Sequence, residues 1–243
     1  MRTCIICGEE YNNNLAIAGH MRSHKHDHVL LTELQRQVIL GSLLGDMSIC
    51  IRSHCKSPNI TVSQSTVQTE YLMWKYDTLW NLTTGTKPHI FSQLSDFGTG
   101  SNKINYMIRF ATMALPCLLP IHELVRGDGN KYISKLWLNE IIDPIALAVW
   151  YMDDGCLSSK ASVKFALGLM STEECFALQE WMSNRWDIGS YILKQKSTNQ
   201  RYIHNTYSNL FISSKSNLRK FRDLVEPYII PSMRYKIDKL NYL

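Results

Sequence analysis

The sequence lacks the long apolar run that a membrane helix or a secretory signal requires. Its longest nearly uncharged apolar stretch, residues 111–121, is interrupted by Pro116 and Pro120, whereas a membrane-spanning helix needs about 20 residues. Glycine and proline are scarce too, at 12 and 7 residues, which excludes a collagen-like or linker-like chain. We therefore expect an intracellular protein, in the cytoplasm, the nucleoid or an organelle matrix, that is not secreted.

Charged residues are few, at 19% of the chain, and neither sign dominates. Lys and Arg number 26 against 21 Asp and Glu, so the formal net charge is +5. A charge of this size permits nucleic-acid binding through phosphate neutralisation but does not establish it. Seven cysteines without a secretory signal do not indicate a disulfide framework. The length of 243 residues suits one large domain or two small ones.

The beginning of the chain carries two Cys and two His at the spacing C-x2-C-x12-H-x3-H. These residues are Cys4, Cys7, His20 and His24. Two Cys across a tight turn and two His one helical turn apart can converge on one tetrahedral Zn²⁺. Because Tyr11 and Ile17 stand where a small ββα unit needs core side chains, residues 2–26 resemble a C2H2 zinc finger. So short a segment buries little surface, and we expect one structural Zn²⁺ to supply part of its folding free energy.

The role of this finger is open between two hypotheses. Counting back from the first His, the helix positions that usually face bases are Asn13, Ala16 and Gly19. Only Asn13 has a side chain that could contact a base edge. The finger could therefore act as an accessory clamp on the DNA backbone or as a purely structural unit. We assign residues 1–28 to this finger and its linker.

Two apolar segments that each lead to an Asp repeat at an offset of 108 residues. Residues 38–47 align without gaps with residues 146–155, so that Asp46 and Asp154 occupy equivalent positions. Further downstream, each copy contains an amphipathic stretch with the periodicity of a helix, and segments whose alternation of apolar and polar residues predicts strands. Each copy thus runs helix, two strands, helix, two strands, helix.

This order predicts an α/β (α+β) fold made of two pseudo-symmetric halves. The segments with strand-like alternation are residues 59–64, 88–93, 106–112, 163–168, 190–196 and 208–214. A turn signal at residues 127–130 marks the boundary between the halves. The first half is therefore predicted to span residues 33–127 and the second residues 128–243.

A carboxylate that ends an apolar helix twice is unusual for a protein core, because burying it is costly unless it pairs or binds a cation. If the two helices pack side by side, Asp46 and Asp154 meet at one end. Gly41 and Gly45, one helical turn apart, would let the backbones approach closely. Two close carboxylates repel, and a divalent cation such as Mg²⁺ resolves that repulsion while it also binds substrate phosphate. Hydrolysis of a phosphodiester by metal-activated water is then the natural reaction class.

The two segments are similar to the paired motifs of LAGLIDADG homing endonucleases of the single-chain, two-repeat, intron-encoded type. The first motif corresponds to residues 39–46 and the second, of the WYMDDG variety, to residues 147–155. The segment 227–236 also resembles the ending of intron-encoded members, and the resemblance covers residues 34–240. Met47 departs from the Gly that usually follows the first acid.

The resemblance implies two αββαββα halves whose antiparallel, saddle-shaped sheets lie in the DNA major groove. It implies two or three Mg²⁺ per active-site pair, held by Asp46 and Asp154, with Asp153 outside direct metal contact and able to support the helix end. It also implies catalytic roles for three further residues: Lys131, Lys236 and Gln64.

The implied activity is a metal-dependent double-strand break, with 3′ overhangs, in a long asymmetric DNA target bound by a monomer. The polar faces of the strands would supply the DNA contacts. Together with Asn13 of the finger, the candidates are Arg52, Lys56, Gln64, Gln93, Lys103, Arg109, Lys160, Lys164, Lys194, Lys196 and Arg201.

Three alternatives remain beside the endonuclease. A maturase of the same fold would bind its own intron RNA and assist splicing. A non-catalytic DNA-binding regulator would keep the fold and finger without the chemistry, although retention of Asp46 and Asp154 favours cleavage. In an unrelated α/β protein, the repeats would be no more than helix-packing motifs.

Overall fold

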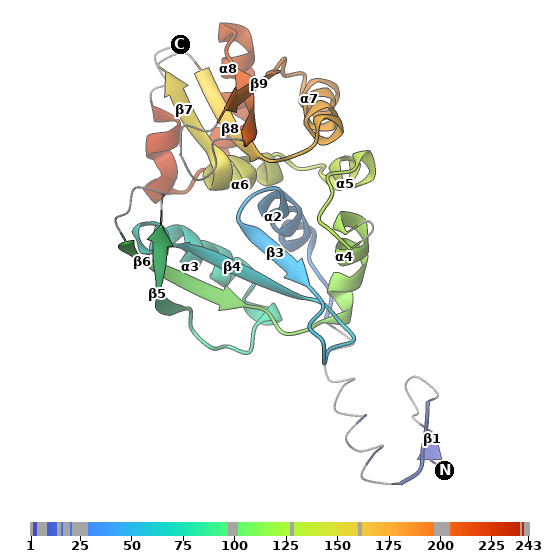
Figure 1. The fold of residues 1–243 in the computed structure, drawn as a ribbon. Coiled ribbons are helices and arrows are strands. Elements are labelled where there is room, and N and C mark those ends of the chain that lie inside the picture. The colour runs from blue at the N-terminus through green and yellow to red at the C-terminus, as the bar shows by residue number, and fades with distance from the viewer. Residues whose placement is uncertain are drawn as a thin grey trace.

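The computed structural model describes residues 2–3, 9–13, 16, 20, 29–96, 102–126, 129–159, 162–196, 205–238 and 240. Two α+β halves, each with a four-stranded antiparallel sheet, lie on either side of a pair of central helices (Figure 1). The predicted order of helix, two strands, helix, two strands, helix is confirmed in both halves. The predicted boundary at 127–128 lies outside the described residues.

The first half contains helices α2 (Glu33–Leu44), α3 (Thr69–Thr78) and α4 (Leu119–Val125), and strands β3 (Met47–Cys50), β4 (Asn59–Ser65), β5 (His89–Asp96) and β6 (Asn102–Ala111). The second contains α6 (Pro144–Asp154), α7 (Thr172–Trp186) and α8 (Lys215–Val225), with β7 (Gly155–Ser159), β8 (Ser162–Gly168), β9 (Tyr191–Lys196) and β10 (Thr206–Ile212). Helix α5 (Lys135–Glu140) connects them (Figure 1). The strand orders β3-β4-β6-β5 and β7-β8-β10-β9 correspond.

The central helices begin at well-formed caps. Thr32 and Gln35 form a capping box at the start of α2, and the side chain of Asp143 accepts a hydrogen bond from Ile145 N at the start of α6. Such caps satisfy backbone N–H groups that have no partner within the helix. Pro144, at the first position of α6, needs no such partner.

Helices α2 and α6 approach each other closely enough to require glycine. A Cβ atom on Gly41 would lie 2.2 Å from the carbonyl oxygen of Ala146, and one on Gly45 would lie 2.5 Å from Cβ of Asp153. The predicted close approach at Gly41 and Gly45 is thereby confirmed. The carboxyl ends of the two helices consequently meet side by side.

Each sheet has one face under the helices and one face open. Alternate strand residues are buried against the helices: Ile60, Val62 and Phe110 in the first sheet, and Val163, Phe165 and Leu210 in the second. We call the opposite side of each sheet the open face. Cross-strand pairing assigns to it Ser63, Phe91, Gln93 and Arg109 in the first half, and Lys164, Ala166, Tyr191 and Phe211 in the second.

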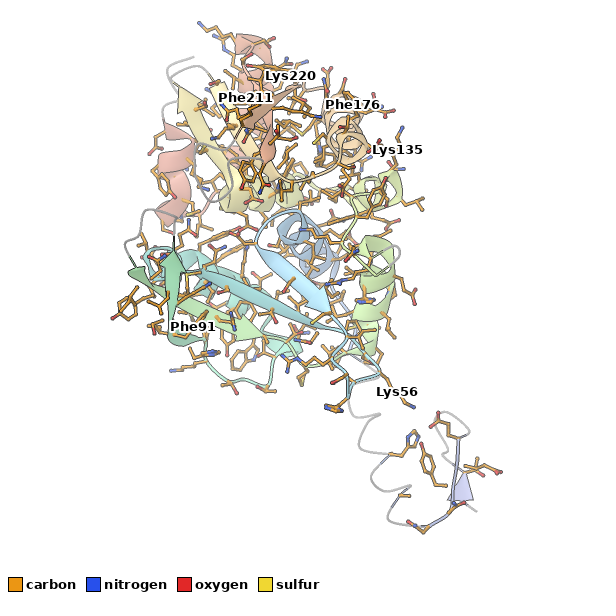
Figure 2. All side chains as sticks on the ribbon, in the orientation of Figure 1. Lys56, Phe91, Lys135, Phe176, Phe211 and Lys220 are labelled. Carbon is orange, nitrogen blue, oxygen red and sulfur yellow. The ribbon has the colours of Figure 1, made fainter. Side chains whose placement is uncertain are left out.

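Two large aromatic side chains on or beside the helices that cover the sheets are exposed. Trp80 is 52% exposed because α3 ends at Thr78, and a short 3-10 turn beginning at Trp80 redirects the chain. Phe176 on α7 is 60% exposed and points outward (Figure 2). In the same helix Trp181 and Trp186 are buried.

Strand β1 (Arg2–Thr3) lies apart from the two four-stranded sheets in Figure 1. Strands β1 (Arg2–Thr3) and β2 (Glu10–Tyr11) pair in antiparallel fashion. Among all described residues, the helices are too short or too polar to cross a membrane.

Candidate functional site

The two repeat-ending acids meet where α2 and α6 end. Asp154 is the last residue of α6, and Asp46 follows Gly45, the C-cap of α2. The surrounding protein desolvates Asp154 and, together with the carboxylates of Asp46 and Asp153, raises its pKa to about 7. Desolvation and the Asp153 carboxylate likewise raise the pKa of Asp46. The site therefore concentrates negative charge in a region partly withdrawn from water.

A divalent cation fits this charge. In the described part of the chain, neither Asp46 nor Asp154 has a cationic side chain within 4 Å, whereas Asp153 pairs with Lys75. Carboxylate oxygens are suitable ligands for Mg²⁺, which commonly uses one or two of them and completes its shell with water and phosphate. Consistent with such an incomplete protein shell, no group of three or more His, Cys, Asp or Glu among the described residues is arranged to hold a metal alone.

Gln64 connects the two halves at this site. It projects from β4, and its side-chain nitrogen donates hydrogen bonds to Oδ2 of Asp46 and Oδ1 of Asp153, both at 3.1 Å. Its side chain is buried and lies on the helix side of the strand, alternating with the open-face residue Ser63. The structure thus brings Gln64 to the acids rather than to the open face.

Lys75 and Asp153 form a buried ion pair that the sequence interpretation missed. Lys75 Nζ lies 2.6 and 2.9 Å from the two carboxylate oxygens of Asp153, and both side chains are fully buried. A signal was present in the sequence. Lys75 lies on the apolar side of α3, one helical turn after Leu72 and directly before Tyr76. A solvated lysine is not expected at such a position.

Lys131 lies close enough to Asp154 for their charges to interact. The surrounding protein partly desolvates the Lys131 ammonium and lowers its pKa, while the Asp154 carboxylate opposes this change most strongly. Its backbone forms an isolated bridge with Arg126. Lys131, in the connection between the halves, thus places a cation near Asp154.

Lys236, the other lysine with a predicted catalytic role, donates to the end of α6. Its Nζ lies 2.6 Å from the carbonyl oxygen of Met152 and 2.8 Å from that of Gly155. Burial lowers its pKa, and the Tyr151 hydroxyl donates back to its carbonyl at 2.6 Å. Cations are favourable at helix carboxyl ends, so this lysine supports the segment that presents Asp154.

The predicted DNA contacts divide between the two sides of the sheets. Those on the open face are Gln93, Arg109 and Lys164. Those in the exposed β3–β4 loop are Arg52 and Lys56. Lys194 and Lys196 lie on the helix side of β9 with Ile192, and Lys194 donates to the Thr172 hydroxyl at 3.0 Å. Lys103 pairs with Ser95 in the β5–β6 ladder, and Lys160 and Arg201 lie outside the described residues.

Aromatic rings accompany the open-face cations. The Arg109 guanidinium stacks over the ring of Phe91, 4.3 Å from its centroid, and Tyr191 stacks on Phe211 at 5.6 Å. Figure 2 labels Phe91 on the first sheet and Phe211 on the second. Tyr191 is 40% exposed whereas Phe211 is 7% exposed, so in the second half Tyr191 is the ring that offers contact area at small entropic cost.

Three of the four predicted zinc ligands, Cys4, Cys7 and His24, lie outside the described residues. The fourth, His20, stacks on Tyr11 with ring centroids 4.5 Å apart. Asn13, the predicted base-contacting residue, accepts a hydrogen bond from Ala16 N at 2.7 Å.

Comparison with known proteins agrees with this architecture. Residues 36–215 match the model of the LAGLIDADG DNA endonuclease family. The chain is 30% identical over 213 residues to the cytochrome b mRNA maturase bI2 of Saccharomyces cerevisiae, covering 85% of this chain and 47% of that protein. It is 26% identical over 226 residues to protein RecA of Mycobacterium gastri, covering 86% and 48%. The chain thus spans about half the length of these curated relatives.

Among solved structures, the fold is similar to that of the homing endonuclease I-WcaI bound to its DNA recognition sequence. The TM-score is 0.75 at 18% identity, and the match covers 96% of each chain. A two-half α+β fold of this kind is therefore known among solved structures. Because the family model covers most of the chain, this protein belongs to the LAGLIDADG DNA endonuclease family.

Proposed function

We propose that this protein is a site-specific homing endonuclease that makes a metal-dependent double-strand break, with 3′ overhangs, in a long asymmetric DNA target. The observation that carries the proposal is the meeting of Asp46 and Asp154 at the ends of two packed helices, each directly before the first strand of its own sheet. Two pseudo-symmetric acids suit two DNA strands, one acid to each scissile phosphate. We place the activity in a monomer, in whichever intracellular compartment holds its target DNA.

Asp46 and Asp154 would hold Mg²⁺, two or three ions per active-site pair. When bound, the metal supplies charge neutralisation at the phosphate and activation of a water nucleophile. Gln64 orients the Asp46 carboxylate, and Lys131 stabilises negative charge that develops beside Asp154. Because the Lys236 ammonium donates hydrogen bonds to carbonyl oxygens at the end of α6, we propose that it holds Asp154 in position and has no catalytic role.

The open faces would contact the DNA. Arg109 and Lys164 carry donors suited to phosphates and guanine edges, and Gln93 carries an amide suited to base edges. The two faces differ in every one of these residues, which favours an asymmetric target.

Cleavage by the acid variants tests the main proposal. Asp46→Asn and Asp154→Asn should each abolish the double-strand break in Mg²⁺, because each removes a metal ligand, while DNA affinity in Ca²⁺ stays within about threefold of wild type. The target would be selected from a randomised or genomic library, and cut ends would be sequenced to detect 3′ overhangs. Undiminished double-strand cleavage by either variant would contradict the site.

A maturase function is the second candidate, and similarity to the bI2 maturase favours it. It requires binding of intron RNA, which could use surfaces other than the cleavage site. Splicing of the encoding intron by the Asp46→Asn variant, with cleavage lost, would establish both functions. A non-catalytic DNA-binding regulator would bind a duplex without cutting it in Mg²⁺.

We further propose that Cys4, Cys7, His20 and His24 bind one structural Zn²⁺ in a C2H2 finger. The pairing of β1 with β2 and the packing of Tyr11 on His20 support a small finger-like unit. Cys4→Ser should lower the zinc content from about one ion per chain, as measured by atomic absorption. If the finger clamps DNA, target affinity falls as well; unchanged affinity would leave it a purely structural unit.

A further inference from the structure

Asp153 belongs to the second half, yet its side chain is held by the first. It receives hydrogen bonds from Lys75 at 2.6 and 2.9 Å and from Gln64 at 3.1 Å, and Asp46 N lies 3.5 Å from its Oδ2. Its Cβ occupies the space where a side chain on Gly45 would lie. The Asp153 side chain therefore packs against the first half in the space left free by Gly45.

Lys75 fixes the orientation of this carboxylate. Its ammonium is fully buried and lies 4.4 Å from the centroid of the Tyr71 ring, and the Tyr71 hydroxyl donates to the Val149 carbonyl of α6 at 3.1 Å. A buried ion pair adds little net stability, since desolvation offsets the attraction, but it permits few alternative geometries. Here the ion pair holds α6 of the second half in a fixed position against α3 of the first half.

The fixed carboxylate in turn fixes Gln64. The side-chain nitrogen of Gln64 contacts both Asp153 and Asp46, and an amide NH₂ group has two hydrogens to donate. With both directed at carboxylates, the amide cannot rotate without losing a bond. A connected path therefore runs from Lys75 through Asp153 and Gln64 to Asp46.

Among the residues that the structure describes, the second half has no equivalent path. In the β3–β4 ladder Met47 faces Val62, and in the β7–β8 ladder Gly155 faces Phe165, so the counterpart of Gln64 is Leu167. When the starts of α3 and α7 are aligned, the counterpart of Lys75 is Leu178. Both leucines are buried and can neither donate nor accept a side-chain hydrogen bond. In the described part of the chain, this hydrogen-bonded path reaches Asp46 and has no counterpart at Asp154.

We propose that Lys75 and Asp153 are positioning residues that preset Asp46, so that cleavage of the two DNA strands depends on them unequally. The inference rests on the proposed endonuclease function. Loss of the pair should slow the strand served by Asp46 much more than the strand served by Asp154, because Asp154 is supported by Lys131 and by the Lys236 cap.

The test uses the full chain with Lys75→Met and Asp153→Asn together, which removes both charges without leaving one buried alone. On an end-labelled target duplex in Mg²⁺, the rate on one strand should fall at least tenfold more than the rate on the other. Plasmid substrate should consequently accumulate as nicked circle. If the double variant does not fold, Lys75→Gln with Asp153→Asn, which also leaves no charge buried alone, serves the same comparison.

Gln37→Ala is the matched control, because it weakens the same helix interface at its other end. Gln37 donates to the Glu140 carbonyl and accepts from Ile142 N, both at 3.0 Å. This variant should leave the ratio of the two strand rates unchanged. A wild-type ratio in the double variant would overturn the inference, and a wild-type protein that cuts neither strand would overturn the proposed function and the inference with it.

A second readout does not depend on cleavage. In ¹⁵N-labelled, metal-free protein, the side-chain amide of Gln64, assigned with Gln64→Ala, should give two well-separated proton resonances because its hydrogens face two different carboxylates. The double variant should bring these resonances toward the values of a free amide, and Gln37→Ala should not. Resonances that do not move in the double variant would show that Lys75 and Asp153 do not position Gln64.

Discussion

At the scale of single residues, Asp154 makes the stability of the metal-free protein depend on pH. Its pKa of about 7 in the folded state lies above its ordinary value, so between about pH 4 and pH 7 the folded state holds a proton that the unfolded state has released. The contribution of Asp154 to the free energy of unfolding must therefore fall as pH rises through this range and level off above it. In EDTA, Asp154→Asn should lose less Tm than wild type between about pH 5 and pH 8.

The effect of Mg²⁺ on Tm provides a second test of the role of Asp154. Mg²⁺ binds the ionised carboxylate, so it should raise the Tm of wild type at about pH 8 and raise that of Asp154→Asn less. Asp77→Asn, which changes an exposed carboxylate on α3, should follow the wild-type curve in both conditions. Equal pH dependence in wild type and Asp154→Asn would show that Asp154 does not bind the additional proton.

At the scale of elements, the contact between α2 and α6 depends on the absence of a side chain at Gly41. Gly41→Ala should destabilise the protein by about 1–3 kcal/mol, because the added Cβ meets the rigid backbone of Ala146. For a chain of this size that corresponds to about 2–4 °C of Tm per kcal/mol. Ser42→Ala, the next residue on α2, is the matched control.

Ser42 Oγ is buried without a hydrogen-bond partner in the described part of the chain, so its removal should be neutral or stabilising. Thermal unfolding of the two variants separates the steric effect from a general effect of changing α2. A stable Gly41→Ala protein would mean that the helices can move apart without loss of packing.

The elements that the sequence predicts are those with a strong pattern of their own. The central helices carry an apolar run, caps and a terminal acid, and both were predicted. Strands β3 and β7 have no such pattern, because they are short and begin directly after the two acids that end the apolar segments. The sequence also does not show which face of β9 is covered. Ile192 lies on one side and Tyr191 on the other, so the alternation of apolar and polar residues does not identify the buried face. The path from Lys75 to Asp46 joins residues from three elements, which no local pattern brings together.

At the scale of the whole molecule, the net charge of +5 matters less than the side of the sheet on which each cation lies. Lys164 is on the open face, opposite Cys156 and Phe211, whereas Lys194 donates to Thr172 on the helix side. Lys164→Ala should weaken target binding and reduce the slope of log K against log salt by about one unit, the loss of roughly one phosphate contact.

Lys194→Ala removes the same charge from the same half, so total charge is equal in the two variants. If DNA lies on the open faces, its salt slope should match wild type, as measured by fluorescence anisotropy in Ca²⁺ across a salt series. If net charge alone drove binding, both variants would weaken it equally, and the open faces would lose their assignment as the DNA-binding surface. The two variants therefore distinguish binding that depends on the position of cations on the open faces from binding that depends on net charge alone.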